Sequence, residues 1–462
     1  MLSRLFMPML TVAGDQAQSL DRHRTPKDPT VEHGLRVVKG LILAVILLQR
    51  VAIPGAGVSI ALPLVIAGYA YLAARGLLEV HQHRALLYLL TCTACLTAAL
   101  SLTLNGVPTS LNSLSLLLLM YLPAIFVARS DLRRRYVSIL RFFSTVMLVA
   151  SVLALAEWAL QLLGLRYYDV VGGLLPKQLL VPGYNTSYPI EYGSSLYKSN
   201  GLVFLEPSFF SQFTALAVLT QIVLAERQRR IAAYLFALVT SVSGTGVFLL
   251  GVGLTVLAVR RGVWWTARLL VTAAVAVGIV ATVPGLGGIF LNRSKETSAS
   301  GTSGNLRFVK PYQVLVEGIT ATPQSALTGF GPGSDDRYGK AYFERFGLPL
   351  GNPTLQKALF EYGLLSGMLL VFFLVYVILS GARSPTLAAA LLCQHLLLSG
   401  GLLQPQTLYA CLLLGPLFCS RRARTMGHHA AGSGELAAAA EGIRGLPGLV
   451  VASRRVREER GL

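Results

Sequence analysis

Long apolar runs recur along the chain from Val37 to Cys419, and they constrain the fold more than any other feature. Most of them are near or above the ~17–20 residues that cross a bilayer. Backbone polar groups in lipid must be satisfied within the protein, which leaves only helices or closed barrels. The runs do not alternate apolar with polar residues, so a barrel is excluded. An all-α, polytopic membrane protein is predicted, and a charged fraction of only 13% agrees with it.

We expect about twelve membrane-spanning helices. The expected spans cover residues 37–53, 57–74, 86–104, 111–128, 137–164, 207–225, 231–243, 246–259, 267–285, 355–381, 386–402 and 407–419. The short pair 231–243 and 246–259 flanks Ser243-Gly244-Thr245-Gly246, and a broken pair of this kind is typical of helix ends that line a cavity. The helical domain is therefore placed at 37–419, between a basic tail over 1–36 and a second basic tail over 420–462 that we expect to be poorly ordered.

The charge distribution predicts how the chain crosses the membrane. Lys plus Arg number 40 against 21 Asp plus Glu, a formal net charge of +19. This excess gathers in alternate connectors, as expected for cytoplasmic loops, so it indicates membrane topology and not a nucleic-acid partner. Both termini are then cytoplasmic, and the two long polar loops 165–206 and 286–353 lie outside. The five cysteines all fall in apolar runs, which predicts core residues and neither metal ligands nor disulfides.

The first outer loop ends in the run Lys-Ser-Asn-Gly-Leu-Val-Phe-Leu-Glu-Pro-Ser-Phe-Phe-Ser-Gln, residues 198–212. Ionisable groups at a bilayer edge are costly and usually functional, which makes Glu206 a candidate active-site carboxylate. Pro207 suits the first turn of a helix. Glu206 could instead be a carboxylate favoured by the helix dipole and by capping, and both roles can hold together. The tyrosines of this loop either form an interfacial aromatic belt or stack on sugars.

The second outer loop carries cations that the positive-inside rule disfavours, which is consistent with an anionic ligand. Arg307 and Lys310 are three residues apart and would share one helix face. Arg337 lies further along the loop, and Asn352 stands just before the next span. The Gly-rich turn Gly329-Phe330-Gly331-Pro332-Gly333 is no Walker loop, and ATP is not the expected energy source. Neither a serine triad nor a metal site is indicated, because the outer loops contain no His.

These motifs resemble those of the bacterial O-antigen ligase and polymerase superfamily, most closely the exopolysaccharide repeat-unit polymerases. The resemblance covers residues 165–370. It rests on the 198–212 run, on Ser243-Gly244-Thr245-Gly246, and on the Gly-rich turn followed by Asn352 and Glu361-Tyr362-Gly363-Leu364-Leu365-Ser366-Gly367. It implies a GT-C-like helical fold in the bacterial inner membrane. It further implies a metal-independent glycosyltransferase without a cofactor, whose donor is a glycan on undecaprenyl pyrophosphate.

The resemblance leads to a hypothesis for each site residue. Lys198 and Arg307 would bind the two phosphates and stabilise the leaving group. Glu206 would orient or deprotonate the acceptor hydroxyl, so Glu206 and Arg307 are the expected catalytic pair. Further substrate contacts are expected from Asn200, Lys310, Arg337 and Asn352. Membrane lipid, and the flippase and chain-length regulator of the same pathway, are the expected partners.

Two alternative functions remain open. An O-antigen ligase would use the same chemistry to move finished glycan to another acceptor. Family ligases usually carry His directly before the Asn of the later motif, where this chain has Gly351, and that difference favours a polymerase. A lipid-linked-sugar flippase or transporter would place charges within its spans near mid-membrane. Here the charges gather in the two outer loops, which favours chemistry at the surface.

Overall fold

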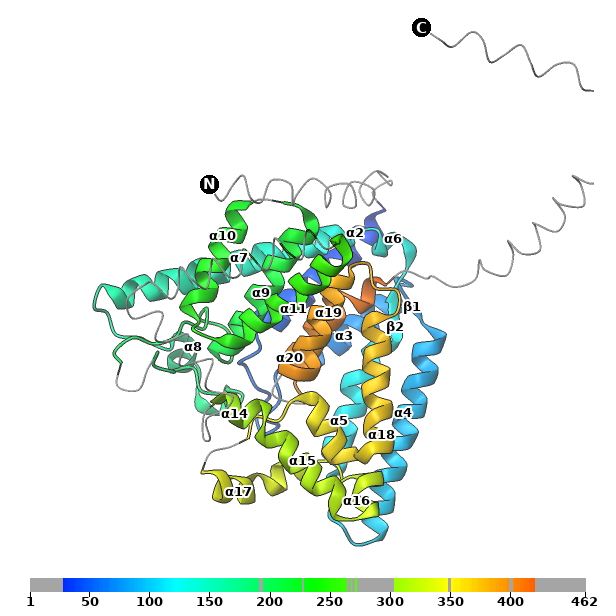
Figure 1. The fold of residues 1–462 in the computed structure, drawn as a ribbon. Coiled ribbons are helices and arrows are strands. Elements are labelled where there is room, and N and C mark those ends of the chain that lie inside the picture. The colour runs from blue at the N-terminus through cyan, green and yellow to red at the C-terminus, as the bar shows by residue number, and fades with distance from the viewer. Residues whose placement is uncertain are drawn as a thin grey trace, which may run out of the picture. The chain divides into compact units, whose positions relative to one another are not determined.

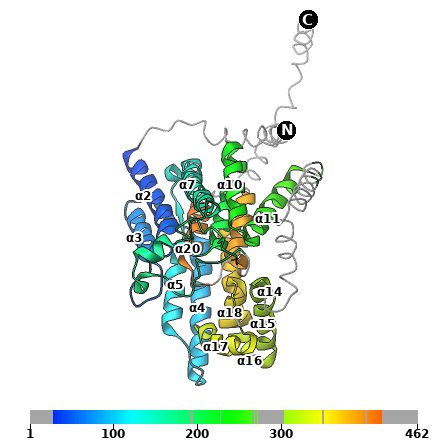
Figure 2. The ribbon, with the colours of Figure 1, turned by 90° about the vertical axis from the view of Figure 1, so that its left-hand side faces the viewer.

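The computed structural model describes residues 28–190, 194–226, 228–262, 303–347, 350–398 and 402–419, together with the single positions 264, 267 and 271. The chain is mostly helical (Figures 1 and 2). Several expectations lie outside the described residues: the first part of the N-terminal tail, most of the span at 267–285, the start of the second loop at 286–302, and the C-terminal tail.

The α-helices are α2 (Pro29–Leu47), α3 (Ala61–Ala74), α4 (Gln82–Leu104), α5 (Leu111–Tyr121), α6 (Ser130–Arg133), α7 (Tyr136–Leu162), α8 (Val170–Leu174), α9 (Pro207–Leu224), α10 (Gln228–Thr240), α11 (Gly244–Arg261), α14 (Ser303–Phe308), α15 (Lys310–Ala321), α16 (Pro323–Thr328), α17 (Ser334–Phe346), α18 (Thr354–Leu379), α19 (Pro385–Cys393) and α20 (Pro405–Leu414). Short helical turns follow three of them: η1 (Leu122–Ile125) follows α5, the π-helical η3 (Gln394–Leu398) follows α19, and η4 (Pro416–Phe418) follows α20. A further 3-10 turn, η2, covers Lys177–Leu179.

Within the described residues, five helices are long and apolar enough to cross a membrane: α4, α7, α9, α11 and α18. Four shorter apolar helices cover Ala61–Ala74, Leu111–Ile125, Pro385–Leu398 and Pro405–Phe418. A helix rises 1.5 Å per residue, so about 20 residues cover a hydrocarbon core of about 30 Å. The prediction of a helical membrane protein is confirmed at this level.

Two details differ from the expectation. First, α2 begins at Pro29, inside the segment assigned to a polar tail, because Val31 and Leu35 continue the buried face of the helix. Asp28 caps it by accepting a hydrogen bond from the Thr30 amide. Second, the chain is not purely helical: β1 (Leu78–Val80) pairs antiparallel with β2 (Phe126–Ala128). The expected span at 111–128 therefore ends as helix at Ile125 and continues as a strand.

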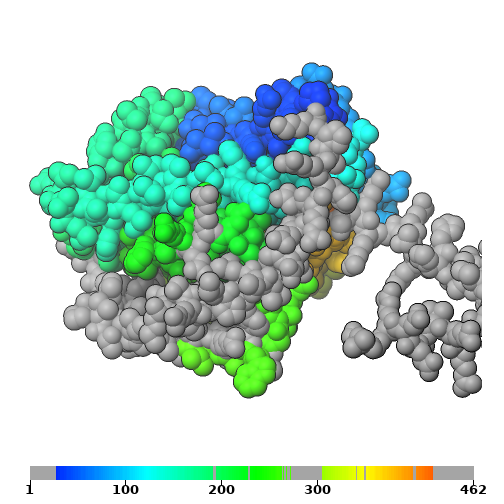
Figure 3. Space-filling model, turned by 90° about the horizontal axis from the view of Figure 1, so that it is seen from above, coloured from blue at the N-terminus to red at the C-terminus, as the bar shows by residue number. Residues whose placement is uncertain are grey.

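α9 is the central helix of the structure. It packs against α7, α10, α11 and α19, and its side chains are buried on nearly every side. Figure 3 shows α7 as a teal band between the blue N-terminal helices and the green α10 on the face seen from above. Glu206, the residue just before α9, therefore stands at the end of a helix that neighbouring helices hold in place.

The connectors gather at two ends. At the first, Arg84 donates hydrogen bonds to the carbonyls of Pro416 and Val377, beside the β1–β2 pair. Arg383 donates to the Phe418 carbonyl there. At the other end, the Ser110 amide donates to the Pro332 carbonyl. Helices α14–α17 lie toward that second end in both ribbon views (Figures 1 and 2).

The Gly-rich turn docks on a break in α18. Gly363 has φ 73° and ψ −177° inside this helix, so the carbonyls just before it lose their helical partners. The amide of Phe330 donates to the Phe360 carbonyl, and the amide of Gly331 donates to the Glu361 carbonyl. The two parts of the later motif thus meet through their backbones, and this contact holds the second loop against α18.

Candidate functional site

The site is built around the start of α9. Glu206 is the N-cap residue, with extended backbone, and Pro207 occupies the first helical position. The Glu206 side chain makes no capping hydrogen bond to the helix. It accepts instead from the Ser208 hydroxyl at 3.1 Å. The carboxylate therefore does not serve as a cap, although it still lies near the positive end of the helix dipole.

Arg307 comes from the second loop and faces this carboxylate. Arg307 Nη2 lies 3.7 Å from Glu206 Oε2, and the side chains are 22% and 13% exposed. Arg307 is on the short helix α14, whose position is set by the segment before α18, where the Gly351 amide donates to the Leu306 carbonyl. The structure thus brings together one residue from each of the two long polar segments.

Both residues line one pocket of about 670 Å³, which we call the α9 pocket. Lys198 and Tyr188 form part of its wall from the first loop. Lys198 Nζ lies 5.8 Å from the centre of the Tyr188 ring, a cation–π distance. The first turns of α9 and α11 add Pro207, Ser208, Ser243, Gly244 and Thr245, and the rest of the wall is Val242, Phe248, Gly304 and Phe308. Two helix N-termini and two cations therefore surround a single carboxylate.

Small residues let α11 come this close to α9. A Cβ on Gly246 would lie 2.5 Å from the Ser211 carbonyl oxygen, so only glycine fits at this crossing. The Thr245 hydroxyl bonds to the hydroxyls of Ser211 and Ser243, at 3.1 and 3.0 Å. The Ser-Gly-Thr-Gly motif thus fixes the N-terminus of α11 at the pocket, where its dipole is positive.

The environment of the Glu206 carboxylate shifts its pKa. Desolvation raises the pKa of Glu206 above its ordinary value, while Arg307 and the Ser208 hydroxyl act in the opposite direction. Tyr184 lies close enough to respond, since burial and then the charge of Glu206 raise the pKa of its phenol to about 12. The Tyr184 hydroxyl accepts a hydrogen bond from Gln404 Nε2. Nothing in the sequence distinguishes Tyr184 from the other tyrosines of its loop.

Three of the expected substrate-binding residues make other contacts and do not line the α9 pocket. Asn200 is buried and closes a turn, since its Oδ1 accepts from the Leu202 amide and its Nδ2 donates to the Phe204 carbonyl. Lys310 donates to Gln313 Oε1 and lies over the ring of Phe346. Arg337 donates to the Phe330 carbonyl at 3.0 Å and so braces the Gly-rich turn.

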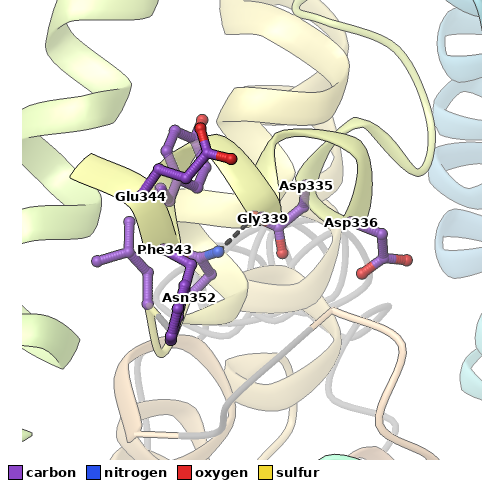
Figure 4. Close-up of a pocket in the computed structure, with 8 residues that line it drawn as sticks. Asp335, Asp336, Gly339, Phe343, Glu344 and Asn352 are labelled. Carbon is purple, nitrogen blue, oxygen red and sulfur yellow. Dashed lines mark hydrogen bonds between the residues drawn. The ribbon is translucent and has the colours of Figure 1, made fainter. Parts of the chain in front are cut away.

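Asn352 belongs to a neighbouring polar cluster. Its Nδ2 donates to Asp335 Oδ1, as Figure 4 shows. Asp335 in turn pairs with Lys357 Nζ at 3.2 Å, and Lys357 Nζ lies 3.7 Å from Glu361 Oε1. All four side chains are nearly buried. Lys357 and Asp335 are not among the site residues expected from the sequence, although a Lys and a Glu four residues apart at the start of an apolar run indicate a pair.

A strap over residues 350–352 connects this cluster with the α9 pocket. Gly351 lies against Arg307, because a Cβ at position 351 would be 3.3 Å from Arg307 Nε. The next residue, Asn352, is bonded to Asp335. Arg307 is therefore positioned by the same segment that the buried cluster anchors.

No group of three or more His, Cys, Asp or Glu side chains that could hold a metal ion occurs within the described residues. The α9 pocket offers charge and hydrogen bonds, and its cations suit an anionic ligand. Comparison of the whole chain with protein-family models found no match, and comparison with curated protein sequences found no significant match.

Proposed function

We propose that the chain is a membrane glycosyltransferase of the O-antigen ligase and polymerase superfamily, joining undecaprenyl-pyrophosphate-linked oligosaccharide repeat units into a longer polysaccharide. The observation that carries this proposal is the pairing of Glu206 with Arg307 at 3.7 Å in a pocket that also contains Lys198. A base for a hydroxyl and cations for a diphosphate are the two requirements of glycosyl transfer from such a donor.

The electrostatics of the α9 pocket suit a diphosphate. Arg307 presents a planar set of donors that matches phosphate oxygens, and Lys198 adds a second positive charge. The N-termini of α9 and α11 bring positive dipole ends to the pocket wall. Negative charge that develops on the departing diphosphate would be stabilised by the same groups.

Glu206 is suited to the acceptor side of the reaction. A hydroxyl of the acceptor glycan attacks the anomeric carbon of the donor as the bond from that carbon to the diphosphate oxygen breaks. The hydroxyl proton passes to the Glu206 carboxylate, and the lipid diphosphate leaves. Burial favours this role because it raises the pKa of Glu206 toward the pH at which a general base works best.

The proposal includes the finer topology expected from the sequence: about twelve spans in a GT-C-like arrangement in the bacterial inner membrane, with both termini cytoplasmic. The α9 pocket would then face the periplasm. The grouping of Arg84 and Arg383 with the β1–β2 pair at the opposite end supports this orientation. A reaction driven by the donor's own diphosphate suits a compartment without ATP. The flippase and chain-length regulator of the pathway would be its partners.

A ligase is the alternative within the same chemistry. Gly351 stands where family ligases usually carry His, and a side chain at this position would lie against Arg307. A ligase would transfer glycan to an acceptor of another kind, whereas a polymerase yields longer lipid-linked chains. A flippase or transporter would carry the lipid-linked sugar across vesicles and form no glycosidic bond.

The test is to incubate the purified protein with a lipid-linked repeat unit and to separate the products by length. A ladder of lengthened lipid-linked chains is expected. Glu206→Gln should abolish it, and Arg307→Ala should strongly reduce it. Glu317 and Arg345 form an exposed ion pair in the same loop, so Glu317→Gln and Arg345→Ala are matched controls that should retain the ladder. A full ladder from Glu206→Gln would remove the proposed base, and transport without bond formation would overturn the proposal.

A further inference from the structure

A second pocket lies beside α17, with a volume of about 530 Å³ (Figure 4). We call it the α17 pocket. Asp335, Asp336 and Glu344 supply carboxylates to its lining, and Tyr342 and Phe343 supply aromatic rings. It shares no lining residue with the α9 pocket. Its charge also differs, since two cations and one carboxylate line the α9 pocket, whereas three carboxylates line this one.

The side-chain amide of Asn352 lies in one wall of the α17 pocket. Asn352 is 8% exposed and lines the pocket, and its Nδ2 is bonded to Asp335. Its Oδ1 has no hydrogen-bond partner within the part of the chain that the structure describes. Asp335 is fixed from below by Lys357. Asn352 Oδ1 is itself buried, so the acceptors that a ligand in the pocket would reach are the exposed carboxylates of Asp336 and Glu344.

Gly339 gives the α17 pocket its open side. This residue lies within α17 and has no positive φ that would require glycine. A Cβ at this position would meet nothing within 4 Å. Glycine weakens a helix interior, and neither backbone conformation nor packing explains it here. The missing side chain leaves room for a ligand to approach the helix backbone.

The chemistry of the lining selects the class of ligand. Carboxylates accept hydrogen bonds from hydroxyls, and aromatic rings pack on apolar C–H faces. Phe343 is 54% exposed and available for such a contact. The carboxylates do not form a metal-binding group within the described residues. Hydroxyl-rich molecules without negative charge meet these requirements, and anions are repelled.

We propose that the α17 pocket is a carbohydrate subsite that holds a neutral segment of the acceptor glycan. This rests on the proposed function, because only a glycan-joining enzyme has an acceptor to hold. The strap over 350–352 then has a role, since Asn352 touches the α17 pocket and Gly351 touches Arg307. Acceptor and donor would be held on the two sides of one short segment.

Calorimetry on the purified full-length protein tests the subsite directly. The probe is a lipid-free neutral oligosaccharide released from the polysaccharide of the host bacterium. We expect saturable binding, a loss of affinity of tenfold or more in Gly339→Leu, which fills the pocket, and a similar loss in Phe343→Ala, which changes only an exposed side chain. Glu317→Gln, which changes only an exposed ion pair, should bind as the wild type does. No binding to the wild type, or undiminished binding to both pocket variants, overturns the proposal.

A second probe separates this proposal from the proposed function. Inorganic pyrophosphate should bind the α9 pocket, lose affinity in Arg307→Ala and be unaffected by Gly339→Leu. Failure of pyrophosphate to bind, with the oligosaccharide still bound, would count against the donor site and leave the carbohydrate subsite standing. A uronic-acid oligosaccharide of the same length should bind at least tenfold more weakly than the neutral one. Equal or tighter binding of the acidic sugar overturns the charge argument.

Discussion

Gly363 and Gly329 are in contact through their backbones: a Cβ on Gly329 would lie 2.5 Å from the Gly363 nitrogen. Gly363 has a positive φ that interrupts α18, and the carbonyls it releases accept hydrogen bonds from Phe330 and Gly331. The second loop is therefore fastened by a backbone contact to a helix that is long and apolar enough to cross a membrane. The helices α14 and α17, which carry the residues of the two pockets, depend on that fastening.

Gly363→Ala should destabilise the protein, because alanine is strained at this φ and its Cβ would lie 2.3 Å from the Leu327 carbonyl oxygen. The backbone strain alone is about 1–3 kcal/mol. Thermal unfolding in detergent measures the loss. Gly251→Ala is the matched control, because a Cβ there meets nothing within 4 Å and the residue lies in the regular helix α11. Equal melting temperatures for both variants would show that the contact is not needed.

The buried cluster makes a second stability prediction. Lys357 is the cation between Asp335 and Glu361, so Lys357→Met leaves two carboxylates uncompensated. Breaking a buried pair in this way costs about 3–5 kcal/mol. Adding Asp335→Asn should recover part of the loss, since it removes one of the two orphaned charges. Thermal unfolding of the single and double variants tests this, and strictly additive destabilisation would contradict the coupling.

The helices of this protein were predictable from the sequence because apolar runs of membrane length leave the backbone little choice. The proximity of Glu206 and Arg307 could also be anticipated, since topology placed both loops on one side. The different contacts of Arg307, Lys310 and Arg337 could not be predicted. All three are cations in one loop. Of the three, Arg307 lines the α9 pocket, because the strap over 350–352 is hydrogen-bonded to α14 and holds this helix in position.

Other parts of the site depend on contacts that no local pattern encodes. Asn200 stands in the signature run, but the positive φ of Gly201 and Leu202 makes a turn that uses its side-chain amide. Lys357 lies in an apolar run, and no local pattern identifies its partner Asp335, which is distant in the chain. The break at Gly363 decides which residues of α18 meet the loop, and a glycine within an apolar run does not predict a break by itself.

A substitution at Gly351 tests how the strap over 350–352 positions Arg307, the cation proposed to bind the donor. Gly351→Val places a branched side chain against Arg307, whose Nε would be 3.3 Å from the new Cβ. We expect weaker activity, about tenfold or more, since small displacements in an active site cost large factors in rate. The melting temperature should change little, because Gly351 has no positive φ. Initial rates of chain extension measure the effect, and unchanged rates would show that Arg307 tolerates displacement.

The pH dependence of the reaction tests Glu206 itself. A base works only when ionised, so the rate should rise with pH through the pKa of Glu206, which burial holds above its ordinary value. Arg307 lowers that pKa, so removing its charge in Arg307→Gln should raise it and move the rising limb to higher pH. Arg307→Lys keeps the charge, so the rising part of its pH–rate profile should stay near that of the wild type, while the rate itself falls. Initial rates from about pH 4 to about pH 9 on all three proteins measure these shifts. If the rising part of the pH–rate profile stays in place or moves to lower pH in Arg307→Gln, a group other than Glu206 titrates.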